Sequence, residues 1–177
     1  MTETKQTPMP NLWFRLMALE YRTRKKPRSA ADDLRSAGVA KGMRVLDFGC
    51  GPGRFTLPAA EIVGEGGRVY AVDVHPLAIR MVEKAARTEG LANVRTIQSS
   101  CATGLDAETI DVALLFDALH DVVDRESVLG EIRRILKPKG ALLYRDHTLS
   151  GIRLVELMRA NDFRLASEAS ILSFVKC

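Results

Sequence analysis

The sequence lacks any uninterrupted apolar run near the roughly 18 residues that a membrane-spanning helix needs. Its first residues also lack the apolar core and the small-residue cleavage site of a secretory signal. On these absences we expect neither an integral membrane protein nor a secreted protein. We therefore expect a cytoplasmic protein with no membrane span.

Cysteine is scarce, since Cys50, Cys101 and Cys177 are widely spaced and form no C-x-x-C pair. This pattern gives no indication of a disulfide framework or of a zinc site built on paired cysteines. We expect all three side chains to be reduced thiols that fill space.

The composition suits one globular domain. The chain has 177 residues, of which 46% are hydrophobic and 27% charged, as is ordinary for a soluble domain with a substantial core. Seven basic and two acidic residues precede residue 29, so this leader carries +5 and the remainder −1. The remainder is therefore no generic nucleic-acid-binding surface. We divide the chain into a leader with a candidate lid helix, residues 1–28, and a domain over residues 29–177.

Hydrophobic periodicity predicts helices in the leader and then strands that alternate with helices. Asn11 suits the cap of a helix that runs to about Lys26, before Pro27 ends it. The expected strands are 43–48, 68–74, 93–98, 110–116, 141–144, 163–168 and 171–176. The other expected helices are 29–37, one that ends at 63, 76–89, 125–136 and 152–160, and a turn is expected at 137–140.

Strands that alternate with helices and consist of nearly continuous apolar runs indicate a parallel sheet covered on both faces. The predicted fold class is therefore α/β, with a Rossmann-like, mostly parallel sheet and helices on both of its faces. In such sheets, ligands bind outside the carboxyl ends of the strands, where the winding reverses. We expect the functional residues to follow the strands directly.

The most informative stretch is a strand that leads into a turn with glycine at positions 49, 51 and 53. Glycine is needed where the backbone bends sharply and where a ligand lies against it. Asp73 ends the next expected strand, twenty residues after Gly53. Pro76 suits the first position of the following helix, so His75 is the expected cap, and the Asp73 carboxylate is left for ribose hydroxyls. This spacing predicts a ligand that contains adenosine.

The glycine spacing also bears on which adenosine ligand is bound. Dinucleotide sites use G-x-G-x-x-G, whereas Gly49, Gly51 and Gly53 form G-x-G-x-G. Asp47, two residues before the loop, would repel a pyrophosphate. Its carboxylate suits the ammonium group of a ligand with an amino-acid end, directly or through water. A dinucleotide is therefore the alternative ligand.

At this point a family resemblance becomes specific. Residues 46–53, Leu-Asp-Phe-Gly-Cys-Gly-Pro-Gly, resemble motif I of the class I S-adenosylmethionine (SAM)-dependent methyltransferases, and residues 69–73 resemble their motif II. Residues 111–113 with 118–120, and residues 135–141, resemble motifs of the branch that includes the ubiquinone and menaquinone biosynthesis methyltransferases. The two closing β segments are similar to the final hairpin of this family, which implies an antiparallel last strand.

The resemblance implies SAM as the cofactor, with the three loop glycines facing its methionine part, Asp73 its ribose and Val74 its adenine. The full set of expected cofactor contacts is Asp47, Gly49, Gly51, Gly53, Asp73, Val74, Ser100, Cys101 and Phe116. The sequence departs from the family in one respect. An Asp often follows the third strand there, whereas this chain has Gln98-Ser99-Ser100-Cys101. Ser100 or a backbone group would have to substitute for that carboxylate.

Methyl transfer from a sulfonium is an in-line displacement, so the protein mainly has to align the reactants. A general base is needed only where the acceptor loses a proton. The expected catalytic candidates are His120 after the fourth strand and His147 after the fifth. Asp117 and Asp146 could also hold magnesium, as in the catechol-type O-methyltransferases. The resemblance is to the metal-free branch, however, and histidine is a poor magnesium ligand, so we expect no metal.

The connection after the fifth strand is too short for a cap domain, which leaves the leader as the segment that could cover the site. We predict that its helix forms a lid, with Trp13 or Tyr21 near the acceptor. Its basic end would attract an anionic small-molecule acceptor. The alternatives are a packed helix with a solvated basic end, a membrane-surface contact and an RNA contact.

The predicted function is SAM-dependent methyl transfer to a small-molecule acceptor. Two other functions stay open. One is an RNA- or protein-directed methyltransferase that uses the basic leader, and the other is a non-catalytic nucleotide- or dinucleotide-binding module. Nucleic acid is the less favoured partner, and the sequence predicts no oligomeric state.

Overall fold

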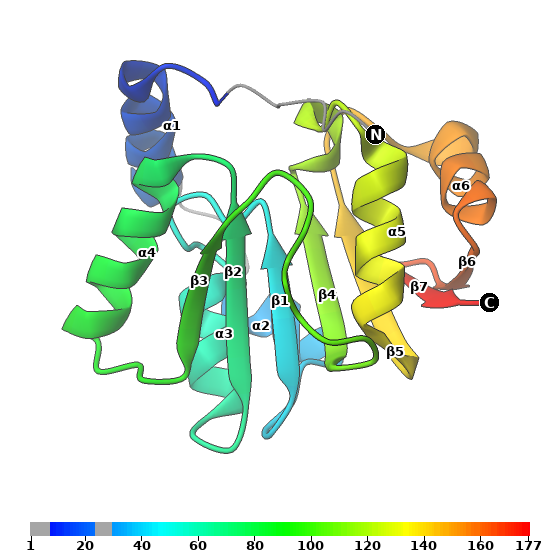
Figure 1. The fold of residues 1–177 in the computed structure, drawn as a ribbon, viewed down its shortest axis with the longest axis horizontal. Coiled ribbons are helices and arrows are strands. Elements are labelled where there is room, and N and C mark those ends of the chain that lie inside the picture. The colour runs from blue at the N-terminus through cyan, green and yellow to red at the C-terminus, as the bar shows by residue number, and fades with distance from the viewer. Residues whose placement is uncertain (1–7, 24–29) are drawn as a thin grey trace.

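The computed structural model describes residues 8–23 and 30–177. Seven strands form one sheet in the order β3-β2-β1-β4-β5-β7-β6 (Figure 1). The strands are β1 (Arg44–Phe48), β2 (Arg68–Asp73), β3 (Val94–Gln98), β4 (Ile110–Phe116), β5 (Leu136–Arg145), β6 (Phe163–Ser167) and β7 (Leu172–Lys176). Pairings among β1 to β5 are parallel, whereas β7 runs antiparallel to β5 and to β6. The predicted fold class, with its antiparallel last strand, is confirmed.

Helices cover both faces of this sheet. In Figure 1, α5 (Arg125–Ile135) lies in front of the sheet, and α2 (Ala30–Ser36) and α3 (Thr56–Val63) lie behind it. The remaining helices are α1 (Asn11–Thr23), α4 (Pro76–Thr88), the 3-10 turn η1 (Leu119–Asp121) and α6 (Gly151–Ala160). No helix in the described ranges is long and apolar enough to cross a membrane.

Alternation along β4 explains why both faces of the sheet are buried. Ala113 and Leu115 belong to one core with residues of α5 and α6. Val112 and Leu114 belong to a second core with residues of α2 and α3. Successive side chains of a strand point to opposite faces, so a strand that is apolar at every position from 112 to 116 needs a helical layer on each side.

Most element boundaries lie within one residue of the sequence prediction, and two differences are of another kind. Asn11 is the first residue of α1 and not its cap, and the expected continuation beyond Thr23 lies outside the described residues. The expected turn at 137–140 lies inside β5, which begins directly after α5. The pairing of β4 with β5 is irregular there. Ile110 of β4 pairs with Leu136 of β5, but the next paired residues are Val112 and Ala141. The residues of β5 between these two pairs therefore form an irregularity inside the strand. Their turn-like sequence predicts a break and does not reveal that the strand continues.

The winding of the sheet fixes where a ligand can bind. From the central β1 the chain continues through β2 and β3 on one side, and it later returns to β4 and β5 on the other side. The loops that follow β1 and β4 therefore diverge at the carboxyl edge of the sheet. This is the switch point at which open α/β sheets form a crevice.

Candidate functional site

A cavity of about 540 Å³ opens at this carboxyl edge, within the usual range for small-molecule sites. Residues after β1, β2, β3 and β4 form its wall, together with residues of the leader. The expected cofactor contacts that line it are Gly49, Gly51, Asp73, Val74, Ser100 and Phe116. Three expected contacts, Asp47, Gly53 and Cys101, are not part of this wall.

The glycine loop is tied to its neighbours by its backbone. The N–H groups of Gly49 and Cys50 donate to the carbonyl oxygen of Val72, at 2.8 and 3.0 Å. Gly49 has a φ of 76°, and a Cβ there would lie 2.5 Å from the Cβ of Ala118. A Cβ at Gly51 would meet no protein atom within 4 Å. Gly49 thus allows close contact with the loop after β4, and Gly51 leaves open space beside the wall of the cavity.

Asp73 connects the glycine loop to the start of α4. Its Oδ2 accepts from the N–H of Gly51 at 2.9 Å, and its Oδ1 accepts from the N–H of His75 at 2.7 Å. Burial raises the pKa of Asp73, although these two hydrogen bonds oppose the shift. An ionised carboxylate has about four acceptor positions, so about two stay available for a ligand. His75 caps α4, as expected, because its Nδ1 accepts from the N–H of Leu77.

Asp47 lies beneath the loop and is only 3% exposed. Its Oδ2 accepts a hydrogen bond of 2.6 Å from the hydroxyl of Thr56. Burial raises the pKa of Asp47 to about 6, hydrogen bonds from Thr56 oppose the shift, and the charge of Asp73 adds to it. No ion pair joins Asp47 to a basic side chain within residues 8–23 and 30–177. A buried acid of this kind favours a cationic group nearby.

The other two expected contacts that miss the wall pack inside the protein. Gly53 faces α4, where an added Cβ would lie 3.1 Å from Cγ2 of Val82. Cys101 packs against the core shared with α5 and α6. Two aromatic residues that the sequence pattern did not single out, Phe48 and Phe55, do line the cavity. The sequence could not single them out, because an aromatic residue at the end of a strand or before a helix has the same hydrophobic pattern whether it lines a cavity or packs in the core.

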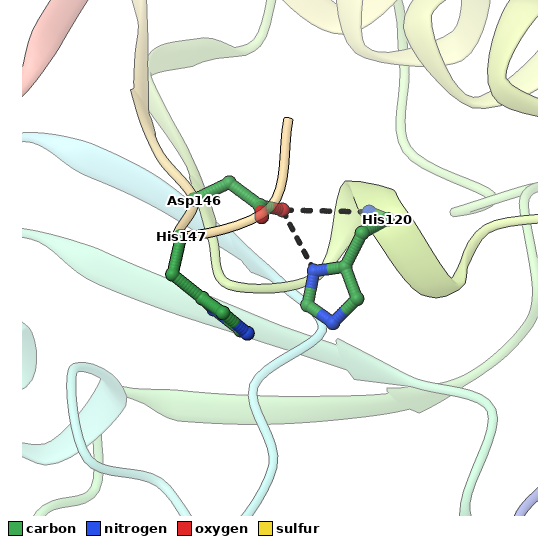
Figure 2. A group of neighbouring side chains, drawn as sticks. All are labelled: His120, Asp146 and His147. Atoms are coloured by element: carbon green, nitrogen blue, oxygen red, sulfur yellow. Dashed lines mark hydrogen bonds and ion pairs between the residues drawn. The ribbon is translucent and has the colours of Figure 1, made fainter. Parts of the chain in front are cut away.

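The two candidate histidines meet near the ends of β4 and β5 (Figure 2). The Nδ1 atom of His120 lies 2.8 Å from Oδ2 of Asp146, whose side chain is fully buried. The Nδ1 atom of His147 lies 3.3 Å from Oδ1 of Asp117. The two imidazole rings lie edge to face, with centroids 4.9 Å apart. These contacts form two carboxylate–histidine pairs side by side.

Asp146 is held in its ionised form. Burial would raise its pKa, but hydrogen bonds from His120 and from the N–H groups of Thr148 and Leu149 outweigh burial and hold the pKa below its usual value. Neither imidazole lines the cavity. Both are one contact away, because Asp117 and Asp121 do line it: Asp117 contacts His147, and Asp121 lies 3.5 Å from Nε2 of His120.

Three of these side chains, His120, Asp146 and His147, also form the group among the described residues that could hold a metal ion. One ligand atom from each of His120, Asp146 and His147 lies within 4.8 Å of the others. Two imidazoles and one carboxylate suit a transition metal and not magnesium. Asp117 and Asp146, the pair weighed for magnesium, do not form such a group.

The leader reaches the cavity, but through other residues than expected. Pro8, Met9 and Phe14 line the wall. Phe14 is 3% exposed and stacks on the ring of His75, with centroids 4.2 Å apart. Trp13 is 65% exposed and does not line the cavity, so its expected place near the acceptor is wrong. The helix turns its Phe14 side toward α4. The side chain of Tyr21 lies outside the described residues.

Comparison with known proteins identifies this architecture. A family model described as a methyltransferase domain matches residues 40–171. The chain belongs to this methyltransferase domain family. A solved SAM dependent methyltransferase from Aquifex aeolicus superposes with a TM-score of 0.77 at 22% identity, over 89% of this chain and 98% of that one. A TehB-like SAM-dependent methyltransferase from Corynebacterium glutamicum has a TM-score of 0.74 at 16% identity, over 95% of this chain and 100% of that one.

Curated relatives agree with the branch suggested by the sequence motifs. The ubiquinone/menaquinone biosynthesis C-methyltransferase UbiE of Cronobacter sakazakii is 33% identical over 109 residues, which is 60% of this chain and 43% of the relative. The demethylmenaquinone methyltransferase of Geobacillus stearothermophilus is 32% identical over 110 residues, which is 62% of this chain and 47% of the relative. The match spans less than half the length of these relatives. The expected family, that of a methyltransferase domain, is confirmed.

Proposed function

We propose that this chain transfers the methyl group of SAM to a small, apolar, quinone-like acceptor that loses a proton as it is methylated. The observation that carries the proposal is the common location of two features. A cavity walled by the glycine loop and Asp73 adjoins the His120–Asp146 pair at one edge of the sheet. The first feature suits the methyl donor, and the second suits removal of a proton from the acceptor.

The residues of the cavity fit the cofactor. Gly51 leaves open space beside its wall, and Asp73 keeps acceptor positions for two ribose hydroxyls. Asp47 does not line the wall, but it lies beneath the loop and supplies a buried negative charge for the ammonium group of the methionine part, directly or through water. Val74 and Ser100 line the same wall and are assigned to the adenine. When bound, SAM supplies a methyl carbon on a sulfonium sulfur, which an acceptor atom displaces in line.

The remaining wall indicates an apolar acceptor. The larger hydrophobic side chains that line it outside the assigned cofactor contacts are Met9, Phe14, Phe48, Phe55, Val122 and Val123. Arg54 lines the same cavity and supplies a positive charge for an anionic group on the acceptor. Relatives named for ubiquinone and menaquinone biosynthesis support an acceptor of quinone-like character.

His120 is the proposed proton acceptor, and Asp146 is its positioning residue. With the Nδ1 proton directed at the Asp146 carboxylate, Nε2 keeps its lone pair for a proton that the acceptor gives up and that Asp121, which lines the cavity, passes on. The imidazolium that forms is then stabilised by Asp146 on one side and by Asp121, 3.5 Å from Nε2, on the other. His147 is the second candidate. Its side chain is 71% exposed and is paired with Asp117, so we assign it the smaller effect.

The proposal is tested by incubating the full chain with SAM labelled in its methyl group and a panel of quinols and phenols. We expect label in an apolar aromatic product, with S-adenosylhomocysteine (SAH) as the other product. Label that appears only in added RNA or protein would contradict the small-molecule acceptor. A chain that binds NAD and not SAH in calorimetry would contradict the cofactor itself.

Substitution of Asp73 tests the cofactor wall. Unmodified protein is expected to bind SAH in the micromolar range, about −8 kcal/mol. Asp73→Ala should weaken this binding by about 2–3 kcal/mol, because two charge-assisted bonds to the ribose are lost. It should also lower the free energy of unfolding by about 1–2 kcal/mol, since the N–H groups of Gly51 and His75 lose their acceptor. Asp73→Asn keeps one carbonyl acceptor, so its affinity for SAH in titration calorimetry should fall between those of the unmodified protein and Asp73→Ala.

Chelation tests whether the cluster of His120, Asp146 and His147 acts through a proton or a metal. We expect turnover to be unchanged after dialysis against EDTA, because a carboxylate-oriented imidazole removes a proton without a cation. Activity that disappears with the chelator and returns with one transition metal would contradict this assignment and make the three side chains ligands. Magnesium serves as the control cation, because imidazole binds it poorly.

A further inference from the structure

Large hydrophobic side chains that are exposed gather on elements at one edge of the molecule. In the described ranges they are Met9, Leu12, Trp13, Leu16, Leu19, Val123 and Ile152. The first five belong to the leader, Val123 follows β4, and Ile152 follows β5 in α6. Figure 1 shows α1 at one end of the upper edge of the sheet and α6 at the other, so the concentration lies in the five leader residues. Exposed apolar residues concentrated in this way mark an interaction surface, whereas scattered ones do not.

Helix α1 has two apolar sides with different surroundings. Its inner side chain, Phe14, is buried against Ala78 and His75. Leu12, Leu16 and Leu19 recur at intervals of four and three residues, which brings them onto one stripe of the helix, and Trp13 lies beside them. We call these four residues the outer stripe. Their exposed fractions range from 51% to 68%, so the outer stripe is not part of the core that buries Phe14.

The charge that follows the outer stripe in the sequence narrows the choice of partner. Residues 22–28 contain Arg22, Arg24, Lys25, Lys26 and Arg28 and no acidic residue. We call these five residues the basic run, and their charge is a property of the sequence alone. An apolar stripe by itself suits a protein or a lipid surface, and a basic run by itself suits RNA or an anionic lipid surface. Both features in one short segment are typical of helices that lie in the interface of an anionic bilayer.

We propose that the outer stripe docks this chain on the surface of an anionic lipid bilayer, to which the positive charge of the basic run attracts it. Leucine and tryptophan side chains enter the boundary between headgroups and acyl chains. The positive charge that the sequence carries in the basic run favours a bilayer with anionic headgroups. Met9 and Val123 are exposed apolar residues that also line the cavity, so the mouth of the cavity is apolar on the side of the leader. An apolar acceptor dissolved in the bilayer can then enter without crossing water. That consequence rests on the proposed function, whereas the docking does not.

Vesicle binding by the full chain, measured without SAM or acceptor, tests the docking directly. Vesicles of phosphatidylcholine with phosphatidylglycerol should be bound about tenfold or more tightly than vesicles of phosphatidylcholine alone, because anionic headgroups attract the basic run. Trp13 is the single tryptophan of the chain, so its fluorescence reports on the outer stripe alone. Its emission should shift to the blue on binding, as the indole leaves water.

Paired variants separate docking by this surface from general charge attraction. Leu12→Ser with Leu16→Ser should weaken binding to the anionic vesicles by about a hundredfold, since two leucines no longer enter the bilayer. Lys25→Glu with Lys26→Glu should weaken it by at least about tenfold. The matched control is Lys41→Glu with Lys139→Glu, which changes the net charge equally. These two exposed lysines precede β1 and lie in the first half of β5, at the opposite edge, and their substitution should change the affinity less than about threefold.

Four results would overturn the docking. They are no binding at millimolar anionic lipid, equal losses for the two charge-reversal variants, binding to an RNA oligonucleotide in place of vesicles, and a dimer that buries Trp13 and ignores vesicles. Circular dichroism of each variant establishes that it is folded. Because no cofactor or acceptor is present, failure of the vesicle experiment leaves methyl transfer standing, and failure of methyl transfer leaves the docking standing.

Discussion

Replacing Asp47 with asparagine is expected to stabilise the chain without its cofactor. Asp47 has its pKa raised from 3.8 to about 6, so between these values the folded chain holds a proton that the unfolded chain has released. Stability is therefore lost as the pH rises from about 4 to about 6, by about 3 kcal/mol once Asp47 is ionised. Asparagine does not ionise, but its buried amide costs about 1 kcal/mol. The net gain at about pH 7.5 is about 2 kcal/mol.

The same substitution is expected to weaken SAH binding by about a hundredfold or more. Removal of one partner of a buried ion pair costs about 3–5 kcal/mol, and we assign Asp47 as the partner of the ammonium group. Urea unfolding at several pH values measures the first effect, and titration calorimetry measures the second. Glu65→Gln, at an exposed position after α3, is the matched control and should change neither quantity.

The two effects can be contradicted separately. Equal pH dependence of unfolding in Asp47→Asn and unmodified protein would mean that Asp47 is not the acid that titrates near pH 6. Unchanged SAH affinity would mean that the ammonium group binds elsewhere. If both predictions hold, the chain gives up stability to keep a negative charge ready for its cofactor, as binding sites commonly do.

The fold could be predicted from the sequence because its signals are local. Each parallel strand is a short apolar run between helices, and the expected β2 at 68–74 differs from Arg68–Asp73 by one residue. The cap at His75 follows from Pro76 at the next position, a rule that involves adjacent residues only. The antiparallel last strand came from family resemblance, and pairing of β7 with β5 confirms it.

The parts of the site that depend on distant contacts could not be predicted in the same way. Helix α1 is apolar on two sides, and the choice of Phe14 over Trp13 depends on His75, about sixty residues later in the sequence. Gly53 faces α4 because Val82 packs against it. In both cases the sequence identifies a residue of the right kind, whereas a partner from another element decides which way it faces.

The histidine cluster illustrates the same limit at the candidate site. Strand order predicts that residues following β4 and β5 meet, because these strands are neighbours in a parallel sheet. It does not predict which carboxylate pairs with which imidazole. Pairing of His120 with Asp146, and of His147 with Asp117, follows from the turn of η1 and from Asp117, whose φ is 48°. A left-handed residue of this kind beside a cavity is a common feature of functional sites.

Replacing His120 with alanine is expected to lower the rate of methyl transfer by about 100- to 1,000-fold, which lies within the range of about 100- to 10,000-fold that a general base contributes. The dissociation constant of SAH should change less than about twofold, because the imidazole does not line the cavity wall. Rapid-quench measurement with methyl-labelled SAM gives the rate of transfer, and calorimetry gives the affinity. His147→Ala should lower the rate less, about tenfold, since that side chain is 71% exposed.

Asp146→Asn tests the positioning of His120 without removing the base. The amide cannot stabilise the imidazolium and can donate to Nδ1, which selects the wrong tautomer, so kcat should fall by about 100-fold or more while KM for SAM stays unchanged. Asp162→Asn is the matched control. Asp162 is exposed, has a φ of 59° that asparagine tolerates, and lies after α6, away from the cavity wall. If His120→Ala raises KM for the acceptor and leaves kcat intact, His120 binds the acceptor and does not take its proton. If Asp146→Asn lowers stability but not kcat, the carboxylate serves the fold alone, through the N–H groups of Thr148 and Leu149.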